Sequence, residues 1–243
     1  MMASESRVYL GNLGKIALCA AIGFLLSLQV VLHPQDRLVA RLVSSHKVLA
    51  LLGQHLTIVG ISSALAILLG VPAGVLLTRR RLRPWAPRAV ALANIGQTVP
   101  SLAVIALSVG LLGIGARTAI IAMWIYSLLP ILTNTLVGLR EVDPQLIEAA
   151  NGMGMRPRRV LLRVELPLAL PMILAGIRTA VTINIGSAIL AAFVGGGGLG
   201  NLIIAGNNIS RIQVLVLGAG LPVLMALAAD AVFEMIEFRT RVH

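Results

Sequence analysis

Charge is scarce in this sequence, and acidic charge is the scarcest: nine Asp and Glu stand against twenty Lys and Arg. Charged residues make up 12% of the chain, about half of what a soluble domain carries, whereas 58% of the residues are hydrophobic. This composition excludes an ordinary soluble domain. A nucleic-acid-binding surface is excluded too, because the basic residues cluster between apolar segments and aromatic residues make up only 3%. We therefore expect one membrane domain in contact with the lipid bilayer and not with nucleic acid.

Cysteine and histidine are too few to build a metal site. Cys19 is the single cysteine and lies in an apolar run, which excludes a disulfide framework and a thiolate metal site. The four histidines have no metal-ligand spacing, and we expect them at membrane interfaces or in loops: His33, His46, His55 and His243. No nucleophile–base pair lies in the apolar runs, which disfavours a membrane enzyme.

Acidic residues are missing from the cores of the long apolar runs. Proton- and sodium-coupled carriers commonly place Asp or Glu within the membrane, so a secondary carrier or a channel is disfavoured. A phosphate-binding loop is also missing, because Gly14-Lys15 lacks the following Ser or Thr and the upstream Gly. We expect no metal and no cofactor on this chain; if ATP and Mg²⁺ drive the protein, another subunit binds them.

Long uncharged runs mark the expected membrane spans, since a spanning helix needs about 20 largely apolar residues. The runs cover residues 16–32, 56–78, 89–116, 118–139, 166 to about 210, and 212–229. The fifth run is too long for one helix and is divided by the four glycines at 195–198. We predict an all-α polytopic bundle of about six helices. Residues 1–55 are expected to form a retained anchor helix and an external loop, and residues 56–243 the main transmembrane domain.

Basic residues set the expected orientation. With the N-terminus inside, fourteen Lys and Arg lie on the cytoplasmic side and five lie outside, while Arg178 falls within a span. This bias favours a multi-pass membrane protein with both termini in the cytoplasm. It also places residues 141–167 in the cytoplasm.

The segment 141–167 is the one long charged interruption in the second half of the chain. Asp143 can cap a helix that begins at Pro144, and Gly152 and Gly154 suit its end. Pro157 can begin a second short helix before the next apolar run. The sequence predicts a basic helix–turn–helix.

This loop resembles a known sequence pattern. Three residues separate Glu148-Ala149-Ala150 from Gly154, and nine residues separate Gly154 from Val164. One more residue then separates Val164 from Leu166-Pro167. The spacing is similar to that of the "EAA" loop of ATP-binding-cassette importer permeases, with Val164 in place of Ile. The resemblance implies a cytoplasmic loop that docks on the ATPase subunits. Its expected coupling residues are Glu148, Ala149, Ala150, Gly154, Arg158, Arg159, Leu166 and Pro167.

Four further stretches resemble the branch of these permeases that imports osmoprotectants such as glycine betaine, choline and carnitine. They are residues 96–104, 118–139, 164–180 and 183–203, with Asn201 where an acidic residue is usual. The resemblance implies the type I importer permease fold, similar to the methionine importer's permease, and a place in the bacterial cytoplasmic (inner) membrane. It also implies a second permease, identical or paralogous, two ATPase subunits, and a periplasmic or lipid-anchored binding protein. An importer of amino acids or other small polar solutes is the alternative.

A polar stripe is predicted on the third span. On a straight helix Asn94, Gln97, Ser101 and Ser108 share one face, with Pro100 producing a kink. We interpret this face as the wall of a translocation pathway, to which Asn134, Asn184 and Ser187 are added. Hydrogen bonding between helices is the alternative explanation. Arg178 can contact substrate or, equally well, bond the carbonyls freed by Pro167 and Pro171.

Overall fold

The computed structural model describes residues 2–34 and 36–241, with side chains throughout these ranges except at positions 2–8, 93, 97 and 241. Every regular element in this part of the chain is a helix, which confirms the all-α prediction. The main helices are α1 (Met2–Leu32), α3 (Ser45–Thr78), α4 (Ala86–Thr98), α5 (Ser101–Leu112), α6 (Ala116–Arg140), α9 (Leu166–Ser187) and α11 (Ile212–Arg241). Short elements join them: α2 (Arg37–Leu42), η1 (Arg83–Trp85), α7 (Pro144–Gly152), α8 (Pro157–Val160), η2 (Leu161–Glu165), η3 (Ala188–Val194) and α10 (Gly200–Asn208).

Five helical segments are long and apolar enough to cross a membrane, namely Tyr9–Leu32, Ser45–Thr78, Ala116–Arg140, Pro157–Val194 and Ile212–Thr240. A sixth is counted if α4 and α5 together form one broken span, in which the two halves meet at 97°. Val99 and Pro100 separate these halves in extended backbone conformations. The break follows from Pro100, because a proline pushes the preceding residue out of the helical region.

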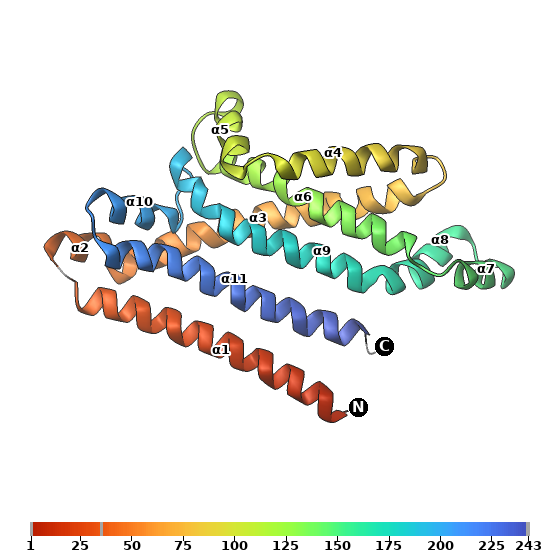
Figure 1. Cartoon of the computed structure of the whole chain (residues 1–243), viewed down its shortest axis with the longest axis horizontal. Helices are drawn as coiled ribbons and strands as arrows, with labels where there is room; N and C mark the ends of the chain where they lie inside the picture. The colour runs from red at the N-terminus through yellow and green to blue at the C-terminus, as the bar shows by residue number, and fades with distance from the viewer. Residues whose placement is uncertain (1, 35, 242–243) are drawn as a thin grey trace.

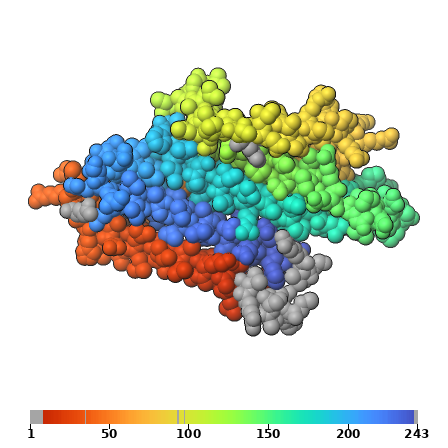
Figure 2. All heavy atoms as spheres, viewed as in Figure 1, coloured from red at the N-terminus to blue at the C-terminus, as the bar shows by residue number. Residues whose placement is uncertain are grey.

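The long helices lie side by side along the length of the molecule (Figure 1). The short helices α7 and α8 extend beyond one end, the end at which both termini lie, and α2 and α10 cap the opposite end (Figure 1). The helix α6 is central and packs on α3 and α9, while α1 packs on α11. In the space-filling view α1 forms one edge of the molecule, and α4 and α5 form the other (Figure 2).

Glycines let α3 and α6 approach closely. A Cβ atom on Gly70 would lie 2.9 Å from Ile131 Cγ2, and one on Gly74 would lie 2.7 Å from Thr135 Cβ. These distances are shorter than real Cβ contacts, so the helix pair depends on the missing side chains. The pattern of two small residues four apart is typical of helix pairs in membranes.

Two boundaries differ from the sequence prediction. The external loop predicted to reach residue 55 is mostly helical, because α3 begins at Ser45. His55 lies inside α3 and is fully buried, with Nε2 3.1 Å from the carbonyl oxygen of Ile185, so its predicted interfacial position is wrong. At the other end α11 continues beyond Ala229 to Arg241, which places Asp230 within a helix. In both places the sequence prediction ends a span at a polar residue, His55 or Asp230. Each of these residues has a polar partner on α9, Ile185 or Arg178.

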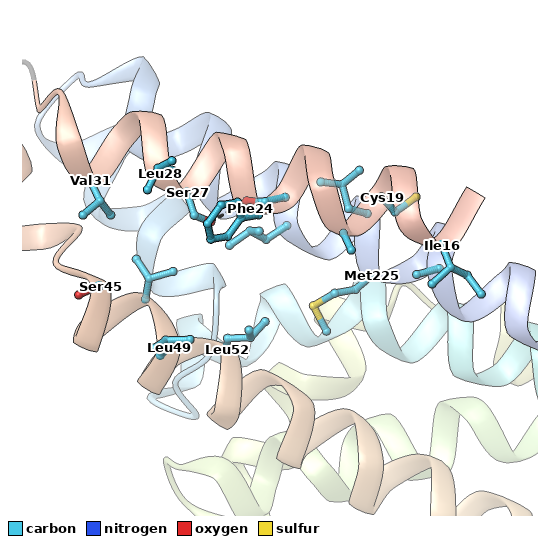
Figure 3. Close-up of a pocket in the computed structure, with 16 residues that line it drawn as sticks. Ile16, Cys19, Phe24, Ser27, Leu28, Val31, Ser45, Leu49, Leu52 and Met225 are labelled. Carbon is cyan, nitrogen blue, oxygen red and sulfur yellow. Dashed lines mark hydrogen bonds between the residues drawn. The ribbon is translucent and has the colours of Figure 1, made fainter. Parts of the chain in front are cut away.

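An apolar groove lies between α1, α3 and α11 (Figure 3). It has a volume of about 460 Å³, and its walls include Phe24, Leu49 and Met225. It opens because α1 packs on α11 while remaining separated from α3 along most of its length (Figure 3). None of the predicted pathway residues lines it.

Candidate functional site

The predicted coupling loop folds as a helix–turn–helix at one end of the molecule (Figure 1). Asp143 caps α7, since its Oδ1 accepts a hydrogen bond from the backbone N–H of Gln145 at 2.9 Å. At the other end of α7, the N–H of Met155 donates to the carbonyl of Ala150 at 3.2 Å. The helix cap predicted at Asp143 is confirmed.

Gly154 has a conformation that glycine favours. Its φ is +75°, in the left-handed region, and a Cβ atom added there would meet nothing within 4 Å. Gly152, by contrast, is the last residue of α7 and has no positive φ. Of the two glycines predicted to end this helix, only Gly154 makes the turn.

The outer surface of this loop is exposed. Glu148, Ala149, Gly154, Arg158 and Arg159 are exposed, and the apolar side chains of Leu146 and Met153 are exposed beside them. The remaining predicted coupling residues differ: Pro167 is exposed, Leu166 half-buried and Ala150 buried. Ala150 therefore supports the loop from within and does not offer a contact surface.

An ion pair joins the loop to α3. Glu165, at the end of η2, is 8% exposed and accepts from Arg79 at the end of α3, with Nη1–Oε1 at 3.1 Å and a second bond from Nη2 to Oε2. The hydroxyl oxygen of Thr78 accepts from Nη2 and Nε of the same arginine at 2.7 and 3.0 Å. The bidentate contact fixes the loop relative to α3.

The polar stripe is not continuous. Because α4 and α5 meet at 97°, Asn94 on α4 and the serines on α5 do not share one face, and this part of the prediction is wrong. Asn94 is exposed and lines a pocket, Ser101 lines a separate small cavity, and Ser108 is buried and donates to the carbonyl of Val104 at 2.8 Å. The side chain of Gln97 lies outside the described residues. The straight-helix projection failed because Pro100 breaks the helix.

A polar pocket, defined here by Asn94, Tyr126, Pro130, Thr133, Asn134, Thr179 and Ile183, lies between α4, α6 and α9. Its volume is about 360 Å³, and the described residues that line it carry no charge. Two of the predicted pathway residues, Asn94 and Asn134, meet here although 40 positions of sequence separate them. The fold thus assembles a polar surface from three helices.

Asn184 and Ser187 lie outside the polar pocket, at a second site. They line a small cavity together with Ser101 and Tyr126. Asn184 is fully buried, and its Nδ2 donates to the hydroxyl oxygens of Ser62 at 3.1 Å and Ser63 at 2.9 Å. This contact joins α9 to α3, which is the interhelical bonding that the sequence left open as an alternative.

Arg178 pairs with acidic residues of α11. Nε lies 2.5 Å from Asp230 Oδ1, Nη2 lies 2.7 Å from Asp230 Oδ2, and Nη1 lies 3.5 Å from Glu237 Oε2. The role considered for Arg178 in bonding carbonyls freed by prolines is replaced by this ion pair. The pair also explains how a charge is accommodated in a span, since each charge has its partner.

At the end opposite the coupling loop, Asp36 joins two elements. Its Oδ1 accepts from the backbone N–H of Val39 at 2.8 Å at the start of α2, and Oδ2 accepts from Arg211 Nε at 2.8 Å. The bond from Val39, followed by those from Arg211, holds the pKa of Asp36 below its ordinary value. This contact fixes α2 against the beginning of α11.

Comparison with known proteins identifies the family. Residues 66–242 match the family described as "Binding-protein-dependent transport system inner membrane component". The chain belongs to this family. The permease is 44% identical over 184 residues to the "Choline transport system permease protein OpuBB" of Bacillus subtilis (strain 168), covering 76% of this chain and 84% of that protein. It is 43% identical over 193 residues to the "Osmoprotectant import permease protein OsmY" of Salmonella typhimurium, covering 79% and 82%.

Solved structures agree on the fold. The permease superimposes on a chain of the inward-facing MetNI methionine ABC transporter with a TM-score of 0.68 at 23% identity, covering 79% of this chain and 95% of that one. This likeness confirms the predicted type I importer permease fold. The matched family region begins at residue 66, so α1 lies outside it.

Three hydroxyl-bearing pocket residues were not among the predicted pathway residues: Tyr126, Thr133 and Thr179. A signal for two of them was present in the sequence. Tyr126, Pro130 and Thr133 recur at intervals of four and three residues, which places them on one face of α6. Only the position of α9 and α4 beside this face shows that these residues line a pocket.

Proposed function

We propose that this permease lines the translocation pathway of an ATP-driven importer of an osmoprotectant with a quaternary amine, such as glycine betaine or choline. The observation that carries the proposal is the exposed coupling loop, which ends the molecule and is tied to α3 through Arg79 and Glu165. The names of the relatives support the substrate class. Other small polar solutes are the alternative.

The partners follow from this function. ATPase subunits with their ATP and Mg²⁺ dock on the coupling loop, a periplasmic or lipid-anchored binding protein delivers the substrate at the end formed by α2 and α10, and a second copy or a paralogous permease completes the pathway. The chain itself hydrolyses nothing. The common end of the termini and the coupling loop supports a cytoplasmic location for both termini (Figure 1). A reporter fused after Arg163 should then read cytoplasmic and one near Lys47 external, and a cytoplasmic signal at Lys47 would refute this orientation.

Gly154→Asp tests the coupling role. The Cβ atom disfavours a φ of +75° by up to about 1–2 kcal/mol, less for Asp and Asn than for other residues, so the carboxylate on the docking surface carries most of the expected effect. We expect the variant to reach the membrane but to lose uptake and substrate-stimulated ATP hydrolysis in proteoliposomes that contain the full transporter.

Two control variants separate the turn from the charge. Gly152→Asp adds the same charge to the same loop at a helical position, and should retain more activity. Gly154→Asn keeps a residue that tolerates the left-handed conformation without adding charge, and should retain most activity. Normal stimulated ATPase activity in Gly154→Asp would contradict the coupling assignment.

A further inference from the structure

Three polar side chains of the pocket donate to carbonyls of their own helices and keep acceptor oxygens. Thr133 donates its hydroxyl proton to the carbonyl of Leu129 at 2.6 Å, and Thr179 donates its own to the carbonyl of Ala175 at 2.9 Å. A hydroxyl has one proton and two lone pairs, so each threonine retains acceptor capacity and no donor. Both oxygens belong to residues that line the pocket.

Asn134 adds a third acceptor. Its Nδ2 donates to the carbonyl of Pro130 at 2.9 Å, and since a carbonyl oxygen accepts only from a donor, this contact fixes which end of the amide is nitrogen. The Oδ1 atom is on the other side of the amide and remains an acceptor.

Pro130 contributes to the same surface. It lies inside α6 and has no N–H, so it cannot donate to the carbonyl four residues before it, at Tyr126. Tyr126 also brings an aromatic ring to the pocket. Acceptor oxygens and a ring face both carry partial negative charge, and together they attract a cation.

None of the described residues that line the pocket carries a positive charge, which would repel such a cation. Arg178, which precedes Thr179 in sequence, is held by Asp230 on α11. Asn94 and Tyr126 can each donate a hydrogen bond, but without a positive charge the pocket cannot compensate a carboxylate or a phosphate. It suits a cation that itself lacks donors, because such a group needs only weak C–H···O contacts and the ring face.

We propose that this polar pocket is a transient binding site for the trimethylammonium group of the transported solute, with Thr133, Asn134 and Thr179 supplying oxygens and Tyr126 supplying the ring. The proposal rests on the proposed function and names the site within it. The neutral wall has a consequence for transport: a carboxylate in the pocket would hold the cation more tightly, whereas a pathway must release it.

Thiol modification with reagents of opposite charge tests the selectivity directly. Thr179→Cys, in a Cys19→Ala background of the full reconstituted transporter, is treated with the trimethylammonium-ethyl and the sulfonato-ethyl methanethiosulfonates. Asn201→Cys, exposed on α10 and outside the pocket, is the control position. After normalisation to a free thiol in solution, we expect the preference for the cationic reagent to be about ten-fold greater at position 179 than at 201. Choline should slow modification at 179 and leave 201 unchanged.

A pair of threonine variants provides the transport measurement. Thr133→Val and Thr57→Val each remove a hydroxyl that bonds a carbonyl one turn earlier, at 2.6 and 2.8 Å, but only Thr133 lines the pocket. We expect choline uptake to fall by about three- to ten-fold in Thr133→Val and to stay at the wild-type level in Thr57→Val.

The outcomes separate the site from the function. Equal reagent preference at 179 and 201 would overturn the proposed site, as would equal uptake by the two threonine variants. If the wild-type transporter imports no choline, glycine betaine or carnitine, the proposed substrate class fails. In that case a preference for the cationic reagent at 179 would still support a cation site.

Discussion

The polar pocket and the apolar groove have similar volumes, about 360 and 460 Å³, but the chemistry of their walls differs. The pocket is built from α4, α6 and α9 and lined by amide, hydroxyl and aromatic groups. The groove is built from α1, α3 and α11 and lined almost wholly by aliphatic side chains, as Figure 3 shows. Volume alone therefore does not identify a pathway in a membrane protein. The chemistry of the wall does, because a polar solute entering the groove would lose its hydrogen bonds.

The two regions also differ in how tightly their helices pack. On the pocket side a Cβ atom on Gly176 of α9 would lie 2.7 Å from Asn134 Cβ and 3.1 Å from the backbone oxygen of Pro130. On the groove side a Cβ atom on Gly23 of α1 would lie 3.5 Å from Leu224 Cδ1 and 3.6 Å from Leu221 Cδ2. The first contact requires the backbone to move, and the second is ordinary van der Waals contact.

The largest expected difference comes from adding a methyl group to one glycine beside the pocket, Gly176, and to one beside the groove, Gly23. Gly176→Ala should destabilise the permease by about 1–3 kcal/mol through overpacking, and should lower uptake at least about ten-fold by displacing Asn134. Gly23→Ala should be neutral or stabilise by up to about 1 kcal/mol, because alanine restricts the unfolded chain in a helix that has room for it. Thermal unfolding of the purified variants and uptake in proteoliposomes measure both. Equal behaviour of the two variants would show that the regions do not differ in packing.

A smaller effect is expected where the two regions meet, at the ion pair between Arg178 of α9 and Asp230 of α11. Arg178→Gln leaves an acidic side chain without its partner in a span, but Asp230 is 41% exposed, so we expect a loss of about 1–2 kcal/mol. The double variant Arg178→Gln with Asp230→Asn removes both charges and should recover most of that loss. Unfolding of the two single variants and the double variant gives the coupling energy. Additive effects would mean that the pair does not hold α9 to α11.

The coupling loop was the part best predicted from sequence. Asp143 acts through its side chain on the backbone two residues later, and Pro144 and Gly154 act through their own backbone, so the cap and the turn depend on a few neighbouring residues. The family resemblance depends on the same local spacing and was confirmed by the family match. The partner of Glu165, in contrast, lies 86 residues away on α3, and nothing local indicates it.

The pathway was predicted less well, and the failures have specific causes. The stripe from Asn94 to Ser108 assumed one axis, which the break at Pro100 removes. Asn184 was expected to face the solute, but it is bonded to Ser62 and Ser63. Periodicity gives the face of a helix but does not show which neighbour covers that face.

The membrane class, the helical fold and the helix–turn–helix of residues 144–160 were readable from the sequence. Each of these follows from local properties: apolar length, and caps that act within one turn. The tertiary structure alone decided which polar groups became a pocket and which became helix contacts. Thr133 and Asn184 are equally polar residues in apolar helices, but one lines an open pocket and the other is sealed against α3. The reason is that a polar side chain in a membrane bonds whatever group lies within reach: Thr133 bonds a carbonyl of its own helix, whereas Asn184 bonds two hydroxyls that packing brings from α3.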